Sequence, residues 1–554
     1  MATKRIHSCQ RRQLRRWRTP LAAALLLSAA PLAAELPIAE TRLIVTLPQN
    51  WQGDASGRLL VFAKPVKPDD TEADKATVDT STFDPKAVSV AAREVASFGA
   101  GRTVQINTQE TAFPAGFAAL PAGDYRVQAV LDRNGDYNYR GRGPGDLVSK
   151  AVTIRWPEQT PATLTLDRPI PDEALWDFTD APKDVRQAIA DARPHLHETL
   201  FESPALSAFW GRPIIIKAWV LTPPSYAADG KATYPTVYET GGFGSTHKNN
   251  IASAARIWTL EADKAIPPMI WVFLDHSSLG TGTTEFADSL NNGPWGHALT
   301  TELIPDLEKQ YRMDAKSSGR FLTGHSSGGW ATLWLQVRYP KIFGGTWSTS
   351  PDPSDFHDFT GADLYRKDAN FYRDDGGKPR PLIREHEKLI ATIPDFARLE
   401  AVLGRNGGQF RSFEWVFSPR GSDGTPMEMF DRNTGAVNPA VVAYWSEHYD
   451  IAHMIEEHWR ELRPDLDGKI HLYVGTADTF YLDGAAHRLD AAMRKAGAHG
   501  QFTYIPDKTH FDLYERDGDK GALTKDIARA MYETARPNMP APTPRRHQKH
   551  SRRP

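Results

Sequence analysis

The chain has almost no cysteine: among its 554 residues only Cys9 carries a thiol. Cys9 lies before an apolar run, in a segment that we expect to be removed from the mature protein. The mature chain would then have no disulfide bond, no cysteine metal ligand and no cysteine nucleophile. Covalent catalysis would have to use another side chain.

A hydrophobic run long enough to cross a bilayer is also missing. The longest apolar stretch, LAAALLLSAAPLAA at residues 21–34, follows a segment with seven Lys and Arg residues and no acid. This pattern is typical of a signal peptide, and Arg11-Arg12 resembles a twin-arginine motif. We predict a signal peptide at residues 1–34, export to the periplasm or beyond, and no stable membrane insertion. An uncleaved anchoring helix is the alternative.

An excess of positive charge is absent as well. The formal charge is −2, and it falls to −15 when the signal segment and the tail at residues 536–554, both basic and free of acids, are left out. Such an acidic core is a poor partner for nucleic acid. The tail is rich in Pro and has no apolar periodicity, so we expect it to be disordered.

Short strands with alternating apolar and polar residues fill the chain from about residue 41 to 170. Turn residues separate them, and this pattern predicts an immunoglobulin-like β-sandwich over residues 35–170. One turn, LDRNGDYNYRGRGPGD, has acids and amides at alternate positions like a calcium loop. Its Gly stands at the wrong place and the bidentate Glu is missing, so a polar hairpin turn fits better and no metal site is predicted.

After a predicted helical linker at residues 171–210, apolar strands alternate with amphipathic helices. This order predicts an α/β domain over residues 211–535, with a mostly parallel sheet covered by helices on both faces. An aromatic-rich stretch at about 352–462 interrupts the order and is predicted to be an insertion. Some of its aromatic residues would form its own core or, alternatively, line a substrate pocket: Trp415, Tyr444, Trp445 and Trp459.

A serine between two glycines follows one of the predicted strands. Residues 324–328, GHSSG, fit the pattern G-x-S-x-G with Ser326 at its centre. The pattern alone is weak, because a chain with 41 Gly residues can match it by chance. Its context strengthens it: GRFLT predicts a buried strand, and apolar residues at helical spacing predict a helix with one apolar face. Such a turn lifts the hydroxyl above the sheet, so Ser326 is the predicted nucleophile rather than Ser327, with His325 packing at the turn.

A serine nucleophile needs a base, and the base needs a carboxylate that orients it. Asp478 follows the predicted strand in HLYVGTAD, and His510 follows the next one in QFTYIPDKTH. One strand–helix–strand unit separates them, which brings both to the sheet edge that carries Ser326. We predict His510 as the base and Asp478 as the acid, with Asp352 and then Asp355 as alternatives for the acid.

The developing oxyanion needs two amide donors. Ser327, directly after the nucleophile, would supply one N–H. The other would come from the glycine-rich loop GGFG at residues 241–244, where Phe243 N–H is our first candidate and Gly242 N–H the second. A glycine-rich turn without this role is the alternative.

From YPTVYETGGFG through GHSSGG and VGTAD to DKTH, the chain resembles the esterase-D-like branch of the α/β-hydrolases. That branch includes enterochelin esterases, feruloyl esterases, S-formylglutathione hydrolases and mycolyltransferases. The resemblance covers about residues 205–350 and 465–530. It implies an α/β-hydrolase fold with Ser326, Asp478 and His510 as nucleophile, acid and base. The chain departs from the pattern at Gly241-Gly242, where His-Gly is common, and in its large insertion.

These features predict an exported serine esterase that cleaves a carboxylic ester through an acyl-enzyme, with no metal and no organic cofactor. A serine peptidase or an acyltransferase on the same fold is an alternative. A catalytically idle binding protein for a glycan or siderophore is another. The expected partner is a small-molecule or polymer-linked ester, whereas the choice of ester and the oligomeric state are left open.

Overall fold

The computed structural model describes six stretches of the chain, which all lie in one unit: residues 43–107, 110–157, 161–228, 230–278, 281–404 and 407–539. The predicted signal peptide at residues 1–34 and the tail beyond Met539 lie outside the described residues. Among the helices that are described, none is long and apolar enough to cross a membrane.

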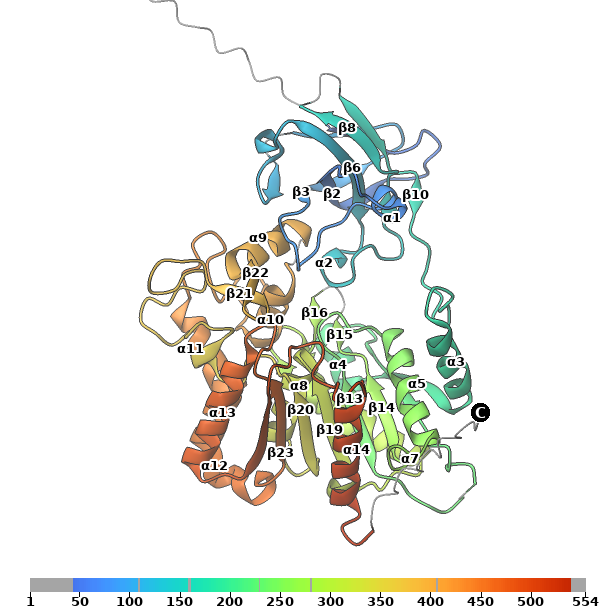
Figure 1. The fold of residues 1–554 in the computed structure, drawn as a ribbon, viewed down its shortest axis with the longest axis vertical. Helices are drawn as coiled ribbons and strands as arrows, with labels where there is room; N and C mark the ends of the chain where they lie inside the picture. Colours follow the sequence, from blue (N-terminus) through green and yellow to red (C-terminus); the bar gives the residue numbers. More distant parts are fainter. Residues whose placement is uncertain are drawn as a thin grey trace, which may run out of the picture. The chain divides into compact units, whose positions relative to one another are not determined.

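Residues 43–169, here called the β-domain, are built mainly from strands in two sheets. The small sheet has the order β4–β1–β9, and the large one is built around β2, β3 and β6 (Figure 1). Alternate residues of a strand point to opposite faces, so Leu59 and Val61 of β2 pack with Leu43 and Val45 of the small sheet. The two sheets therefore share a core. The elements are β1 Leu43–Thr46, β2 Ala55–Pro65, α1 Glu72–Ala76, β3 Ser89–Phe98, β4 Thr103–Ile106, β5 Thr111–Phe113, β6 Gly123–Asp132, α2 Tyr137–Arg140, β7 Leu147–Val148, β8 Val152–Trp156, β9 Ala162–Thr165 and β10 Arg168–Pro169.

The acidic turn after β6 uses its carboxylates to hold its own backbone. Asp132 accepts a hydrogen bond from the amide of Gly135 at 2.8 Å, and Asp146 accepts one from the amide of Gly143 at 2.8 Å. The turn is thus closed by side-chain to backbone bonds, the usual role of Asp in turns.

The rest of the chain is organised around an eight-stranded sheet of order β11–β12–β14–β13–β19–β20–β23–β24. The five pairings from β14 to β24 are parallel, and those of β12 with β11 and β14 are antiparallel. This confirms the predicted α/β class with a mostly parallel sheet. The strands are β11 Leu196–Glu202, β12 Ile215–Leu221, β13 Thr236–Thr240, β14 Ile270–Leu274, β19 Arg320–His325, β20 Gly345–Thr349, β23 Ile470–Gly475 and β24 Gly500–Ile505.

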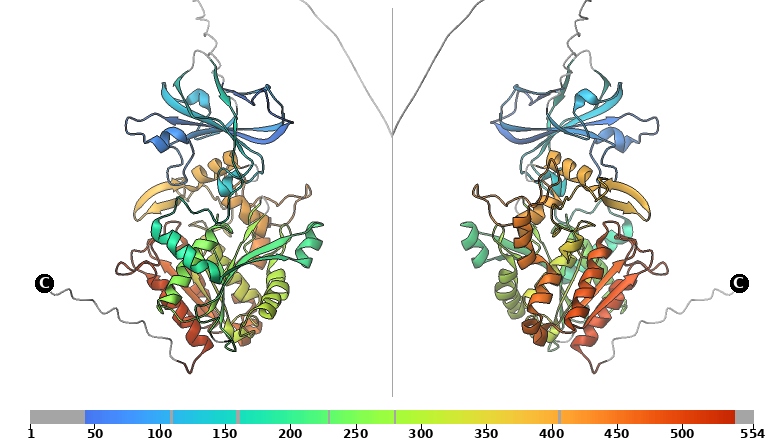
Figure 2. Two further views of the ribbon diagram at one scale, coloured as in Figure 1. Left: turned by 90° about the vertical axis from the view of Figure 1, so that its right-hand side faces the viewer. Right: turned by 90° about the vertical axis from the view of Figure 1, so that its left-hand side faces the viewer.

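Helices cover both faces of this sheet (Figure 2). Successive strand residues alternate between the two cores: Val237 of β13 packs on the face of α3, α5 and α14, and Tyr238 on the face of α8, α12 and α13. A strand buried on both sides is a near-continuous apolar run, which is the pattern seen in the sequence. The helices outside the insertion are α3 Lys183–Ala192, α4 Pro204–Trp210, α5 Asn249–Ala262, α6 Trp295–Ala298, α7 Ile304–Gln310, α8 Ser327–Arg338, α13 Leu482–Ala496 and α14 Ala522–Ala535, and two short hairpins lie at β15 Ser277–Ser278, β16 Gly282–Thr283, β17 Asp288–Ser289 and β18 Gly293–Pro294.

Residues 171–210, expected to be a helical linker, also contain a strand. Helices α3 and α4 lie in this segment, but between them β11 pairs with β12 over its whole length, from Leu196 opposite Leu221 to Glu202 opposite Ile215. The segment LHETLFE does not alternate in polarity, and it forms the edge of the sheet through its pairing with β12. The segment is therefore part of the α/β sheet rather than only a connection.

The insertion, residues 352–462, has an aromatic core of its own that is continuous with one face of the sheet. Trp445 and Trp459 are buried in this core, and the cavity described below is lined instead by Phe396, Phe410 and Phe413. The insertion also covers α8, so that this helix is buried on every side and not only on the one face expected from its spacing. Its elements are β21 Pro381–Glu385, β22 Lys388–Thr392, α9 Ile393–Leu403, α10 Gln409–Phe417, α11 Pro439–Tyr449 and α12 Ile451–Leu466.

Helix α9 connects the insertion to the β-domain, where it lies against β3, β5 and α2 (Figure 1). Arg58 of β2 donates hydrogen bonds to the carbonyls of Ala401 and Val402, each at 2.8 Å. These carbonyls belong to the last turn of α9, where acceptors lack partners within the helix and a positive charge is favourable. Leu399 and Leu403 of the same helix complete an apolar cluster of the β-domain.

Candidate active site

Ser326 stands at the turn between β19 and α8. Its φ of 59° and ψ of −124° are unusual for a residue other than glycine, and such a conformation costs about 1–3 kcal/mol. The turn is held by the amide of Ser326, which donates to the carbonyl of Thr349 at 3.0 Å, and by the amide of Asp352, which donates to the carbonyl of Ser326 at 3.2 Å. A strained serine held at the end of a strand is the geometry of a nucleophile elbow.

The two glycines of the motif are required by the close approach of the backbone at this turn. A Cβ on Gly324 would lie 2.2 Å from the carbonyl oxygen of Gly328. A Cβ on Gly328 would lie 2.0 Å from the carbonyl oxygen of Thr240 at the end of β13. Both positions therefore accept only glycine, which explains the spacing that was visible in the sequence.

His510 and Asp478 form a buried pair at the same edge of the sheet. The Nδ1 atom of His510 lies 2.9 Å from Oδ2 of Asp478, and both side chains are almost fully inaccessible. Burial raises the pKa of Asp478, but the nearby His510 and the amide of Phe480, which donates to Oδ1 at 2.9 Å, outweigh it and leave the pKa below its ordinary value. Asp478 is thus a carboxylate that can orient an imidazole.

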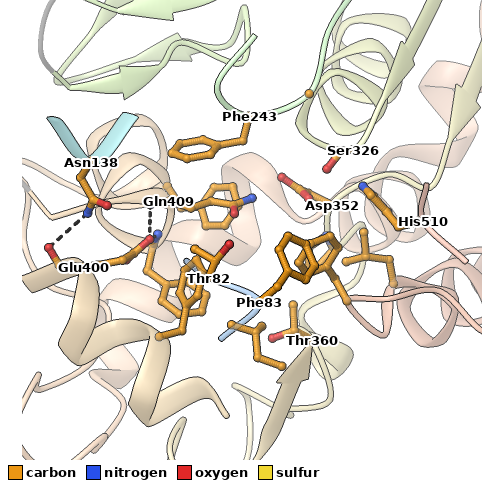
Figure 3. Close-up of a pocket in the computed structure, with 18 of the residues that line it drawn as sticks. Thr82, Phe83, Asn138, Phe243, Ser326, Asp352, Thr360, Glu400, Gln409 and His510 are labelled. Atoms are coloured by element: carbon orange, nitrogen blue, oxygen red, sulfur yellow. Dashed lines mark hydrogen bonds between the residues drawn. The ribbon is translucent and has the colours of Figure 1, made fainter. Parts of the chain in front are cut away.

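Ser326 and His510 line one cavity of about 360 Å³. Figure 3 shows the hydroxyl of Ser326 and a ring nitrogen of His510 pointing toward one another at one end of it. Since Nδ1 is engaged by Asp478, Nε2 is the nitrogen that faces the serine. The three residues predicted as nucleophile, base and acid are therefore brought together.

The two alternatives for the acid, Asp352 and Asp355, make hydrogen bonds to other residues. Asp352 accepts a hydrogen bond from the hydroxyl of Ser327 at 2.6 Å and lines the cavity, and burial raises its pKa to about 6. Asp355 caps a short helical turn by accepting from the amide of His357 at 2.8 Å. Asp478 is the carboxylate that accepts the hydrogen bond from Nδ1 of His510.

The glycine-rich loop after β13 lies against the nucleophile. Gly242 and Phe243 line the cavity, and a Cβ on Gly242 would lie 3.2 Å from Cβ of Ser326. Ser327 is the first residue of α8, so its amide has no acceptor within the helix. The predicted oxyanion donors, the amides of Ser327 and of Phe243 or Gly242, thus lie on either side of Ser326.

His276, after β14, holds this loop in place, a role that no sequence pattern indicated. Its Nε2 lies 3.0 Å from the carbonyl oxygen of Gly242, and its Nδ1 lies 2.7 Å from Oγ1 of Thr283. Burial lowers the pKa of His276, which favours a neutral ring. The neutral ring that fits both contacts donates from Nε2 to Gly242 and accepts from Thr283 at Nδ1.

His325, expected to pack at the turn, lies directly against the predicted base. The centroids of the His325 and His510 rings are 4.3 Å apart. Burial and the neighbouring His510 lower the pKa of His325 to about 3, so it is a neutral ring at ordinary pH.

Arg384 of β21 ties the insertion to the loop that carries Asp478, and it too was missed in the sequence. Its Nε donates to the carbonyl of Asp478 at 2.8 Å, and its backbone amide donates to the carbonyl of Thr479 at 2.9 Å. A further bond at 3.0 Å joins its guanidinium to Asp483 at the start of α13. Arg384 thus positions the acid through the backbone.

Three parts of the chain form the cavity walls. The eight-stranded sheet with its loops, here called the catalytic core, contributes Ser326 and His510. The insertion contributes Phe396, Phe410 and Phe413, and the β-domain contributes a smaller set: Thr82, Phe83 and Asn138. In Figure 3, Asn138 and Glu400 lie at the end opposite Ser326, where Asn138 donates to the carbonyl of Glu400 at 3.1 Å. Among the described residues that line it, the ionisable groups other than histidine are Asp352 and Glu400, with no Lys or Arg.

This sheet order, with a serine at a strained turn after β19, defines the class of the protein: it has an α/β-hydrolase-like fold. The model of a family described as "Putative esterase" matches residues 214–522, more than half of the chain. The chain belongs to this family and is by class a carboxylic ester hydrolase. This confirms the predicted resemblance to esterase-D-like enzymes.

Solved structures of similar proteins include a ferulic acid esterase, with 14% identity over 62% of this chain and 97% of that one and a TM-score of 0.36. The fluorophosphonate-binding serine hydrolase FphF of Staphylococcus aureus has 12% identity over 61% and 98%, with a TM-score of 0.36. An S-formylglutathione hydrolase from Agrobacterium tumefaciens has 14% identity over 61% and 95%, with a TM-score of 0.37. No curated protein matches the chain significantly.

Proposed function

We propose that the protein is an exported serine esterase that works through an acyl-enzyme, with Ser326, His510 and Asp478 as its catalytic triad. The observation that carries this proposal is the buried bond of 2.9 Å between His510 and Asp478, at a cavity that Ser326 enters from a strained turn. Membership of an esterase family supports an ester over an amide as the substrate.

In the first half of the proposed reaction, Oγ of Ser326 attacks the ester carbonyl while Nε2 of His510 takes the hydroxyl proton. The imidazolium is stabilised by Asp478 at Nδ1. The carbonyl oxygen becomes an oxyanion, which accepts hydrogen bonds from the amide of Ser327 and from Phe243 or Gly242. Collapse of this intermediate breaks the bond to the alcohol oxygen, which receives the proton from His510.

In the second half, a water molecule gives a proton to Nε2 of His510 and attacks the acyl carbon, using the same oxyanion donors. The second intermediate collapses to release the carboxylic acid, and the proton returns to Oγ of Ser326. All steps use side chains and amides of this chain together with water.

Labelling with a fluorophosphonate tests this proposal. We expect the intact mass of the wild type to increase by one adduct, and Ser326→Ala to remain unlabelled while its circular dichroism is unchanged. Ser327→Ala is the matched control, and it should still be labelled because its hydroxyl is bound to Asp352 instead of serving as nucleophile. Labelling of Ser326→Ala, or none of the folded wild type, would overturn the assignment.

Export is the second part of the proposal, and it rests on the basic segment and apolar run in residues 1–34. Expression of the full chain in a Gram-negative bacterium should give periplasmic protein. Its intact mass should match a chain from which the residues up to Ala30 or Ala34 have been removed. Replacing Arg11 and Arg12 by Lys should keep the precursor inside the cell if the twin-arginine motif acts as the signal. An unprocessed chain in the membrane fraction would favour the anchoring helix.

We also infer an immunoglobulin-like sandwich over residues 35–170 and a catalytic domain that comprises residues 211–535 together with β11, which precedes them in the chain. The shared core of the two N-terminal sheets supports the first, and the eight-stranded sheet with its insertion supports the second.

A further inference from the structure

Two exposed aromatic residues separate the catalytic cavity from a second hollow. Phe83 of the β-domain and Phe511 of the catalytic core meet edge to face, with ring centroids 5.7 Å apart. Phe83 is 47% exposed and Phe511 is 64% exposed, although both are large and apolar. Both rings line the catalytic cavity and also a groove of about 570 Å³ on its other side. Exposed aromatic rings beside a catalytic cavity are typical of ligand contacts.

The aromatic pair begins next to His510, the residue that gives its proton to the alcohol in the proposed reaction. His510 must give its proton to the alcohol oxygen, so the alcohol portion of the ester has to lie next to this ring. Phe511 is the next residue in the chain, and its ring is 5.3 Å from the ring of His510. Phe480 packs edge-on against His510 at 4.9 Å and against Phe511 at 6.0 Å. An alcohol held beside His510 would therefore lie next to Phe480 and Phe511, and Phe511 leads on to Phe83.

The groove beyond the pair differs in chemistry from the catalytic cavity. The cavity has mainly apolar walls, whereas the groove is lined mostly by polar side chains that carry both signs of charge. The β21–β22 hairpin supplies one side and the loops after β23 and β24 supply the other. These polar residues are Arg384, Glu385, His386, Lys388, Thr479, Thr509 and Asp512.

We propose that this groove binds the alcohol portion of the ester, and that this portion is an extended, uncharged group rich in hydroxyls. The acyl group then lies in the apolar cavity, and the substrate passes between the two subsites over Phe83 and Phe511. Mixed donors and acceptors without an excess of either charge suit hydroxyl groups, and aromatic rings suit the apolar faces of a polyol ring. The β-domain is in consequence part of the active site, because it supplies Phe83. This inference rests on the proposed esterase function.

Two esters of one acid test the proposal: methyl benzoate and benzoate attached to the primary hydroxyl of a disaccharide. We expect Lys388→Ala, which changes the groove and not the cavity, to lower kcat/KM for the disaccharide ester by roughly tenfold relative to the wild type and to leave methyl benzoate within about twofold. Phe83 lines both hollows, so Phe83→Ala should lower kcat/KM for both esters, and for the disaccharide ester by roughly tenfold more. Comparison with the wild type on each ester cancels the intrinsic reactivity of the leaving group. Hydrolysis of the shared benzoyl-enzyme should be unchanged in Lys388→Ala, because the alcohol has already left the groove that Lys388 lines.

Phe209→Ala is the matched control, since Phe209 is an exposed aromatic residue on α4 that lines neither hollow. It should alter neither ester, and thermal unfolding should show all three variants to be folded. Equal losses on both esters, or no loss on either, would overturn the alcohol subsite. Failure of the wild type to hydrolyse either ester or to react with fluorophosphonate would instead overturn the esterase function itself.

Discussion

At the scale of single residues, the charge of Asp352 in the cavity predicts which acyl groups make poor substrates. Asp352 lies in the wall near Ser326, and no Lys or Arg stands among the described lining residues. Burial raises the pKa of Asp352 to about 6, so the carboxyl is mainly ionised at pH 8. An acyl group that carries its own carboxylate would meet a like charge without a compensating cation.

Esters of dicarboxylic acids should accordingly be poor substrates at pH 8. We expect Asp352→Asn to raise kcat/KM for the 4-nitrophenyl monoester of a dicarboxylic acid by roughly tenfold, since it removes the repelling charge. The uncharged ester of the same chain length is the control and should change little. An equal change on both esters would show that Asp352 acts on the shape of the site and not through its charge.

His276 acts on the oxyanion through the loop that it holds. Its hydrogen bond to the carbonyl of Gly242 fixes the amides that follow, so its loss should weaken binding of the transition state more than binding of the ester. We expect His276→Ala to lower kcat by roughly tenfold or more with little change in KM. His276→Gln can place an amide nitrogen near the former Nε2 and should recover part of the rate. Equal activity of the two variants would contradict this role.

At the scale of elements, the β21–β22 hairpin of the insertion supports the loop that carries the acid. Arg384 binds the carbonyl of Asp478 and the carboxylate of Asp483, and it lies over the ring of Tyr481. These contacts fix the backbone from which the Asp478 carboxylate reaches His510. An insertion that interrupts the order of the sheet thus contributes to the catalytic geometry.

Removal of the Arg384 side chain should disturb the acid, and a methyl ester is the substrate for this test because Arg384 also lines the groove proposed for larger alcohols. We expect Arg384→Ala to lower kcat roughly 10- to 100-fold, because small displacements of a catalytic group have effects of this size. The pH profile of kcat/KM is the decisive measurement: a loosened Asp478 stabilises the imidazolium less, so the acidic limb of the profile should move to lower pH. A lower melting temperature with an unchanged profile would indicate a purely structural role.

The elements that the sequence predicted well are those whose signals are local. The turn at Ser326 was visible because its motif lies between a strand and a helix with clear local patterns, and Asp478 and His510 because each lies in the loop after a strand. Strand β11 was missed because its seven residues lack the alternating pattern of a strand, and its pairing with β12 cannot be seen in the sequence. The burial of α8 on all sides depends on Phe417 and Tyr449 from the insertion, which helical spacing cannot reveal. Phe83 joins the cavity through a contact with Phe511 more than 400 positions later.

At the scale of the whole molecule, three buried carboxyls affect stability. Burial raises the pKa of Asp352 to about 6, of Glu239 to about 7 and of Glu400 to about 8. In the unfolded chain such groups titrate near pH 4. Between about pH 4 and 8 the folded protein therefore binds more protons than the unfolded chain, and the free energy of unfolding falls as the pH rises.

We expect the midpoint of urea unfolding to be lower at pH 8.5 than at pH 6 on account of these groups. Glu400→Gln removes the group with the highest of the three pKa values and should make the difference between the two pH values smaller. Thermal melts in the same buffers provide an independent measure. A midpoint that is equal at both pH values, or higher at pH 8.5, would contradict the role of these carboxyls.

The hydrogen bonds between Arg58 and α9 also have a consequence for folding during synthesis on the ribosome. Arg58 and Val402 are 344 positions apart, so the face of the β-domain that receives α9 has no partner when it leaves the ribosome. At about 5–20 residues per second, synthesis of the remaining stretch takes roughly 20–70 s. During this time Phe62 and Val90 of the unfinished protein lack the leucines that later cover them. The early product is therefore a natural client for chaperones that bind apolar surface, and Phe62→Ser should reduce its retention by them.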